Sequence, residues 1–315
     1  MGLHCFHKEA YIKICIIGGT GHIGENLVRM LLVEKSQIFL ITRGNRPVPD
    51  NQCIKFIKKT YDNNLTEWQK LFDEIQPDII IDILGGNALI VYDACRKYCK
   101  HFIVCGSIWM FGEAKVVPTP EITQSACNFP GYAKRYAEML KLKDEAKIDG
   151  MRFTAIMPPN ICGPGKIPLD CYGSRSIENH KNHMRGTPVP LPEPGQTLIG
   201  PCDAEDVARG FYLAVMDPEM AADEIFNVGS SYAITAKEFV ETYGKIYKVE
   251  IPIEWTSWKE YSQEINPQPE ANFHFKAHMC PDISKISKKL GYKPKYTPEE
   301  TMERAVCWMK EQNMI

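Results

Sequence analysis

Three glycines near the start of the sequence have the spacing of a phosphate-binding turn. Gly18, Gly21 and Gly24 follow an apolar run and precede a segment with apolar residues at helical spacing. In such a turn the first glycine permits a tight bend, the second lets the backbone approach a pyrophosphate, and the third lets the helix pack closely. The unpaired N–H groups at the helix start favour an anion. The sequence therefore predicts a dinucleotide site, to which we also assign the intervening residues Thr20, His22 and Ile23.

The end of the next apolar run, 37–42, bears on which dinucleotide binds. Where an NAD site would offer a carboxylate to the adenosine ribose, this chain carries Thr42 and Arg43. A guanidinium can pair with a 2′-phosphate, whereas a carboxylate would repel it. We therefore expect NAD(P) as cofactor, with NADP mildly favoured. The alternative for Arg43 is a solvated cation on a loop.

A repeated alternation of strands and helices must position these residues. Strands are predicted at 37–42, 53–59, 77–84, 100–107 and 151–158, and helices at 65–75, 88–99 and 131–149. Strands rich in Ile and Val that alternate with helices are typical of a parallel sheet covered on both faces. We predict an α/β fold with a doubly wound parallel sheet of the Rossmann type and a smaller C-terminal substrate-binding region.

The composition of the chain changes after Pro158. Segments 158–173 and 185–196 are rich in Pro and Gly and are predicted to be loops. We expect residues 1–165 to form the dinucleotide-binding domain and residues 166–315 to form mainly the substrate-binding region. Within the latter, 198–229 is expected to return to the first sheet.

Overall composition disfavours several classes of partner. The 315 residues are 44% hydrophobic and 24% charged, with a formal net charge of −2, so a nucleic-acid partner is not expected. No stretch approaches the roughly 18 apolar residues of a membrane helix, and the first residues lack the apolar region of a secretory signal. We expect a cytoplasmic protein without a membrane partner. The oligomeric state stays open, with a homodimer as one option.

Cysteine and histidine residues give no clear metal site. The twelve cysteines are scattered without a C-x-x-C pair, which favours reduced thiols. His4, Cys5 and His7 could hold a metal, but nothing nearby supplies a fourth ligand. His180 and His183 lack a third ligand and are expected to be surface residues. No metal is predicted.

Several motifs recur in a characteristic order along the chain. They are the glycine turn, GSIWMFG at 106–112, a tyrosine opening a long helix, PPNICGPG at 158–165, CDAEDVARGF at 202–211 and FNVGSSYAIT at 226–235. Together, from Ile14 to about Gln312, they resemble the extended short-chain dehydrogenase/reductase family, the NAD(P)-dependent sugar-nucleotide epimerases and dehydratases. TRG at 42–44 is similar to the atypical branch that includes the chloroplast stem-loop RNA-binding proteins. The resemblance implies an oxidoreductase or epimerase that acts on a sugar or sugar nucleotide.

The resemblance also implies catalytic residues. In the family a tyrosine exchanges a proton with the substrate, a serine binds the same oxygen, and a lysine four residues after the tyrosine lowers the pKa of the phenol. Tyr132 and Ser107 match this pattern, but Tyr136 stands where the lysine belongs. Arg135 lies on the same side of the helix as Tyr132 and could supply the cation.

Further residues follow from the same resemblance. Gly85 and Gly86 match the place where backbone passes the adenine ribose, and Asn160 matches a position near the nicotinamide or the substrate. Asp203 and Asp206 are expected to cap the helix that follows them.

Tyr136 in place of lysine leaves two alternatives to a hydride-transfer enzyme. One is a catalytically silent nucleotide-binding protein that serves as a scaffold, redox sensor or RNA-associated factor. The other is a lyase or isomerase that uses Tyr132 as an acid.

Overall fold

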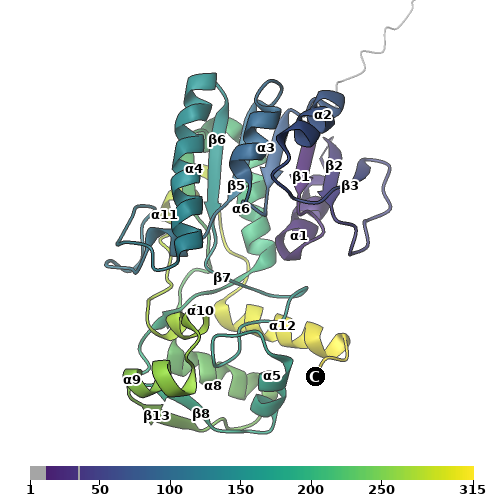
Figure 1. Ribbon diagram of the computed structural model, residues 1–315. Coiled ribbons are helices and arrows are strands. Elements are labelled where there is room, and N and C mark those ends of the chain that lie inside the picture. Colours follow the sequence, from purple (N-terminus) through teal and green to yellow (C-terminus); the bar gives the residue numbers. More distant parts are fainter. Residues whose placement is uncertain (1–11, 35) are drawn as a thin grey trace, which may run out of the picture.

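The computed structural model describes residues 12–34 and 36–315, and its centre is a seven-stranded parallel sheet (Figure 1). The strands, in spatial order, are β11 (Glu224–Asn227), β6 (Arg152–Met157), β5 (His101–Cys105), β4 (Ile79–Asp82), β1 (Ile12–Ile17), β2 (Ser36–Thr42) and β3 (Ile54–Lys58). The strand order changes direction between β1 and β4. In open α/β sheets ligands bind at such a switch point, beyond the carboxyl ends of the strands.

Helices cover both faces of this sheet, so the predicted doubly wound fold is confirmed. One face carries α2 (Leu65–Ile75), α3 (Ala88–Cys95) and α4 (Pro130–Asp149), and the other carries α1 (His22–Leu31), α6 (Ala204–Met216) and α11 (Ser284–Leu290). Along β1, Ile14 and Ile16 belong to one core and Cys15 and Ile17 to the other, because successive side chains of a strand point to opposite faces. None of the described helices combines the length and apolar character that a membrane span needs.

A smaller lobe lies at the carboxyl edge of the sheet, in the lower part of Figure 1. It contains α5 (Ile177–Met184), β8 (Val189–Pro192), β9 (Leu198–Ile199), β12 (Ile234–Thr235), α8 (Ala236–Tyr247), β13 (Ile253–Thr256), α9 (Trp258–Glu260), α10 (Pro269–Asn272) and α12 (Pro298–Glu311). Strand β8 pairs with β13, and a third core surrounds the buried Tyr243 and Met302. The lobe therefore has its own apolar interior.

The chain passes between the sheet half and the lobe several times. Between them, β7 (Asn160–Cys162) pairs with β10 (Pro201–Asp203). The chain then returns to the sheet through α6, α7 (Pro218–Ala221) and β11, and again through α11, which packs on α6 and β11. The two halves are thus built from interleaved segments.

Asp203 joins the two halves at this junction. As expected, its side chain caps α6, since its carboxylate accepts from the Glu205 N–H at 2.9 Å. The same carboxylate accepts from Thr301 Oγ1 and Arg304 Nε of α12, each at 2.9 Å. Asp206 instead accepts the backbone N–H groups of 295 and 296, at 2.8 and 3.1 Å.

The expectation that His180 and His183 are surface residues is wrong. Their exposed fractions are 0% and 1%, because α5 packs against α8. The His180 ring bonds to the Tyr247 hydroxyl at 2.9 Å and to the Pro168 carbonyl at 3.2 Å. The polar residues around these two histidines gave no sign in the sequence that α5 packs against α8.

Candidate functional site

The glycine turn lies between β1 and α1, at the switch point of the sheet. Gly18 has φ +87°, which favours glycine, and its carbonyl accepts from the Gly21 N–H at 3.0 Å. A Cβ on Gly24 would lie 2.4 Å from the Gly19 Cα, so the helix approaches the turn more closely than another residue would allow. The turn therefore offers bare backbone at the first turn of α1.

Two cavities flank this turn and share Gly18, Gly21 and Leu84 in their linings. One, of about 620 Å³, lies between the sheet edge and the lobe. The other, of about 540 Å³, lies over the loops that follow β1, β2 and β3. Both cavities thus border the switch point of the sheet. His22 and Ile23 line the first, and Thr20 lines the second.

The second cavity brings together Thr42, Arg43 and Gly86, with Arg46 and Lys59 beside them. The Thr42 hydroxyl accepts from the Gly44 N–H at 3.0 Å and so shapes the loop that carries Arg43. Arg46 donates to the Thr20 carbonyl at 3.4 Å. This cavity is therefore lined by three cations at the ends of β2 and β3.

Buried polar contacts fix the loop after β4. The Asp82 carboxylate accepts from the Tyr61 hydroxyl at 2.6 Å and from the backbone N–H groups of Leu84 and Gly85. Burial, followed by the charge of Asp82, raises the pKa of Tyr61. Gly85 has φ +61°, and a Cβ there would lie 2.6 Å from the Cys105 carbonyl oxygen. Gly85 thus packs against the end of β5, while Gly86 lines the second cavity.

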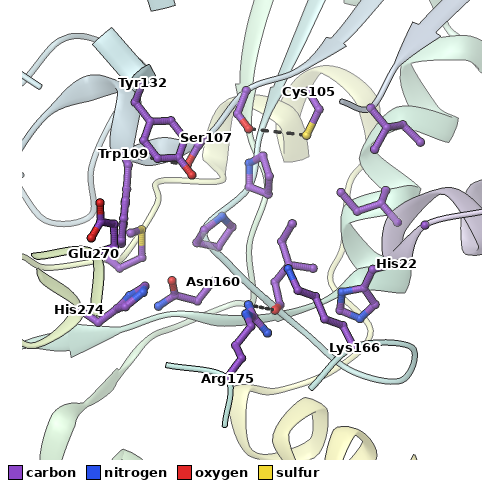
Figure 2. Close-up of a pocket in the computed structure, with 18 of the residues that line it drawn as sticks. His22, Cys105, Ser107, Trp109, Tyr132, Asn160, Lys166, Arg175, Glu270 and His274 are labelled. Carbon is purple, nitrogen blue, oxygen red and sulfur yellow. Dashed lines mark hydrogen bonds between the residues drawn. The ribbon is translucent and has the colours of Figure 1, made fainter. Parts of the chain in front are cut away.

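Ser107 and Tyr132 line the first cavity (Figure 2), and Arg135 belongs to the same lining. Ser107 follows β5, and its Oγ accepts from the Trp109 N–H at 3.3 Å at the start of the short helix Ile108–Phe111. Tyr132 lies in the first turn of α4. The structure therefore brings the serine and the tyrosine to one surface although they are far apart in sequence.

Arg135 is held beside Tyr132 by neutral acceptors. Its guanidinium donates to the carbonyls of Leu84, Gly85 and Cys105 at 3.1–3.3 Å, and its Cζ lies 5.9 Å from the centre of the Tyr132 ring. Within residues 12–34 and 36–315, no carboxylate forms an ion pair with it. Its positive charge is therefore fixed near the phenol and is not neutralised by a direct partner.

Tyr136 lies elsewhere. Its ring packs edge-to-face on Phe111, with ring centres 5.7 Å apart, and its hydroxyl lies 3.5 Å from that of Thr123. It is not part of the cavity lining. The structure therefore separates Tyr136 from the other three catalytic candidates.

The side of the cavity opposite Tyr132 is formed by Asn160, Lys166, Arg175 and His274 (Figure 2). His22 lies at the end near the glycine turn, where its Nε2 contacts the Gly163 carbonyl at 3.1 Å. Burial lowers the pKa of His22 to about 4, so this ring is neutral at pH 7.

Sequence reasoning missed several lining residues, namely Trp109, Lys166, Arg175, Glu270 and His274. Trp109 lies within the motif at 106–112, and Lys166 directly follows the motif at 158–165. Their positions could therefore have marked them as candidate lining residues. Glu270 and His274 come from a segment that returns from the far part of the lobe, and no local pattern marks them.

No metal site is found in the part of the chain that the structure describes, where no group of three or more His, Cys, Asp or Glu is arranged to hold an ion. The segment with His4, Cys5 and His7 lies outside the described residues. Each described cysteine is free, and most are buried.

Comparison with known proteins identifies relatives over most of the chain. The model of the "NAD dependent epimerase/dehydratase family" matches residues 14–89 and 85–229. The chloroplast stem-loop binding protein of 41 kDa b from Arabidopsis thaliana is 25% identical over 304 residues, which cover 90% of this chain and 75% of that protein. UDP-arabinose 4-epimerase 1 from the same plant is 23% identical over 360 residues, covering 96% and 81%.

Solved structures with similar folds include two epimerases. UDP-glucose 4-epimerase from Thermotoga maritima, solved with UDP-glucose, has a TM-score of 0.76 at 20% identity, covering 96% of this chain and 100% of that one. UDP-glucuronic acid 4-epimerase from Bacillus cereus, solved with UDP-glucuronic acid and NAD, has a TM-score of 0.73 at 18% identity, with 96% and 100% coverage.

Proposed function

The chain belongs to the NAD-dependent epimerase/dehydratase family, and from this premise we propose that it transfers hydride between a nicotinamide cofactor and a sugar or sugar nucleotide. The observation that carries the proposal is the common cavity lined by the glycine turn, Ser107, Tyr132 and Arg135. Family membership confirms the expected class, an enzyme of the epimerase/dehydratase type. The choice of substrate and the roles of the residues are our proposal.

The described residues fit a dinucleotide. Two cavities share the lining of a turn whose glycines present no side chain to them, this turn leads into the N-terminus of α1, and a side chain at Gly24 would collide with the turn. A bound nicotinamide would supply the hydride acceptor or donor. We place cofactor binding mainly on residues 1–165 and substrate binding mainly on 166–315, and a homodimer stays a prediction.

Tyr132 is proposed to hold and move the proton. When the carbon that bears a sugar hydroxyl gives up hydride to the nicotinamide, the hydroxyl must also lose its proton, and the Tyr132 phenol lines the cavity where it can accept that proton. Ser107 would donate a hydrogen bond to the same oxygen. Arg135, whose Cζ lies 5.9 Å from the centre of the Tyr132 ring, is proposed to supply the cation that the family pattern places at a lysine.

The adenosine end is proposed to favour NADP. Arg43 lines the second cavity with Arg46 and Lys59, and charge-assisted hydrogen bonds from such groups suit a 2′-phosphate.

The curated relatives named as UDP-arabinose 4-epimerases support a sugar nucleotide as substrate.

The test is substitution of the proposed proton-transfer group. Tyr132→Phe should lower turnover of a responsive sugar nucleotide by about 10²- to 10⁴-fold while leaving nucleotide binding intact, because only the proton path is lost. Turnover is followed by chromatography of the sugar products, and binding by calorimetry with NADH and NADPH.

Tyr98→Phe provides the matched control, since this half-buried tyrosine donates its hydroxyl to Asp73 at the surface and lies outside the cavity. Equal turnover in wild type, Tyr132→Phe and Tyr98→Phe would contradict the proposal. A nucleotide-loaded protein that converts no sugar or sugar nucleotide would favour the catalytically silent alternative.

A further inference from the structure

The central sheet ends at β3, and no other described strand pairs with the outer edge of β3 (Figure 1). On its inner side, the Cys53 carbonyl accepts from the N–H of residue 38, and the Lys59 N–H donates to the carbonyl of residue 42. Alternate residues of a strand direct their backbone groups to opposite sides, so those of Phe56 and Lys58 point to the open side. These groups are available to an extended segment that lies alongside β3.

The side chains of β3 alternate between the two faces of the sheet. Ile54 packs against the core on the side of α1, and Ile57 packs against the core on the side of α2. Phe56 and Lys58 therefore share the first face with Ile54. Lys55 lies on the second face, where its Nζ is 5.4 Å from the centre of a phenylalanine ring of β2. Each face of this edge thus carries a cation next to an apolar side chain.

The outer edge of β3 is exposed and positively charged. Phe56 is 45% exposed, which is unusual for a large aromatic side chain in a sheet. Lys55 and Lys58 are also exposed, and in the described part of the chain neither forms an ion pair with a carboxylate. Two further exposed cations, Arg43 and Arg46, lie on the loop that follows β2. Because the whole chain has a formal net charge of −2, this edge is a local basic surface.

We propose that residues 55–58, the β3 edge, bind an acidic extended segment of a partner protein, which adds to the sheet as a further strand. Backbone hydrogen bonds would supply affinity, and contacts with the side chains would supply specificity. The complement of Lys55-Phe56-Ile57-Lys58 is an acidic residue, two apolar residues and a second acidic residue. This order is the same for a parallel and for an antiparallel partner strand. The sequence of the β3 edge therefore defines the chemistry of its partner.

Other occupants fit the β3 edge less well. Antiparallel pairing with a second copy of this chain would place Lys55 opposite Lys58, and like charges directly opposite each other destabilise a sheet. Lysine on an edge strand is a common protection against such self-association. A nucleic acid or an anionic membrane would meet the cations but would leave the open backbone groups of Phe56 and Lys58 unpaired. An acidic extended peptide satisfies both the charges and the backbone.

Fluorescence anisotropy with two labelled peptides tests the proposal on the full chain. The first probe is a fluorescein-labelled octapeptide with Glu-Val-Val-Glu at its centre. The second has the same sequence with N-methyl groups on both valines, so it keeps its charges but loses two N–H donors. Whatever the strand direction, one of these two donors would face β3. We expect the second probe to bind about 10-fold more weakly, the loss expected for one or two backbone hydrogen bonds.

Charge reversal tests the side-chain contacts. Lys55→Glu and Lys58→Glu should each weaken binding of the first probe by about 3- to 10-fold, because an attractive pair becomes a repulsive one. Lys259→Glu makes the same charge change at an exposed lysine of the lobe and is the matched control. The double variant Lys55→Glu/Lys58→Glu should in turn bind a probe with Lys-Val-Val-Lys at its centre. Circular dichroism of each variant shows whether the fold is retained.

Several outcomes would overturn the inference. They are no binding of the first probe by wild-type protein at millimolar concentration, equal binding of the two probes, and equal affinity of wild type and the variants at Lys55 and Lys58. Binding of a uridine oligonucleotide or of phosphatidylserine vesicles that depends on these lysines, without binding of the peptide, would assign the surface to another class of partner. None of these readouts uses turnover or a nucleotide cofactor, so the result is independent of the proposed function.

Discussion

His101 is a single buried residue whose surroundings make stability depend on pH. It is 1% exposed, and its Nε2 lies 2.8 Å from Thr154 Oγ1, whose hydroxyl donates to the Ala221 carbonyl. The hydroxyl oxygen therefore accepts from the Nε2–H, and Nδ1 has no partner within the described structure. A proton on Nδ1 would have no acceptor. Burial, followed by the charge of Arg152, lowers the pKa of His101 from 6.5 to about 4.

We predict that His101 makes the folded state less stable in acid. Between these two pKa values the unfolded chain binds a proton at this site and the folded chain does not, so the free energy of unfolding decreases as pH falls. The shift corresponds to about 3 kcal/mol, present above pH 6.5 and lost toward pH 4. Urea denaturation at several pH values measures it. His101→Gln keeps a donor for Thr154 and should reduce this pH dependence, and an identical slope in both proteins would contradict the assignment.

Arg43 is the residue on which the choice of cofactor depends. Arg43→Ala should weaken NADP binding by about 1–3 kcal/mol, the range of a charge-assisted contact, and leave NAD binding nearly unchanged. Fluorescence titration with NADPH and NADH measures both affinities. An equal loss for the two cofactors, or no loss for either, would remove the argument for NADP.

At the scale of elements, Asp203 links the start of α6 to α12. Arg304→Leu should destabilise the protein by about 2–3 kcal/mol, because the Asp203 carboxylate, 1% exposed, would lose its cation and one hydrogen bond. Chemical denaturation measures this change. Arg185→Leu breaks a solvent-exposed pair with Glu178 and should cost less than about 0.5 kcal/mol. Equal effects of the two substitutions would show that Asp203 does not join the elements.

The elements also show what could be predicted from the sequence. Helix α2 begins and ends where its periodicity predicted, at 65 and 75, because its apolar face repeats at helical spacing. By contrast, β7 and β8 lie in segments predicted to be loops. Both are short and rich in neighbouring prolines, and their pairing partners, β10 and β13, come much later in the chain. Such distant pairing leaves no local pattern.

The same limit applies to the candidate site. The glycine turn was predictable because it lies between a buried strand and a helix, each with a recognisable pattern, and Ser107 and Tyr132 were identified through motifs that resemble those of the family. The position of Tyr136 against Phe111, and that of Arg135 under the carbonyls after β4 and β5, depend on how α4 packs. The position of His274 in the cavity depends on how the whole lobe folds, and no local pattern in the sequence indicates it.

At the scale of the whole molecule, the interleaved path of the chain determines how the two halves can be separated. Segments of the sheet half and of the lobe alternate along the sequence, and several connections cross the level of β7 and β10 (Figure 1). A protease that cut one of these connections would leave the others in place, and the two halves would stay joined. Neither half corresponds to a single continuous fragment, so expression of 1–165 alone would omit α6, α11 and β11 from the sheet half. The cavity therefore lies between two halves that several separate crossings of the same chain hold together.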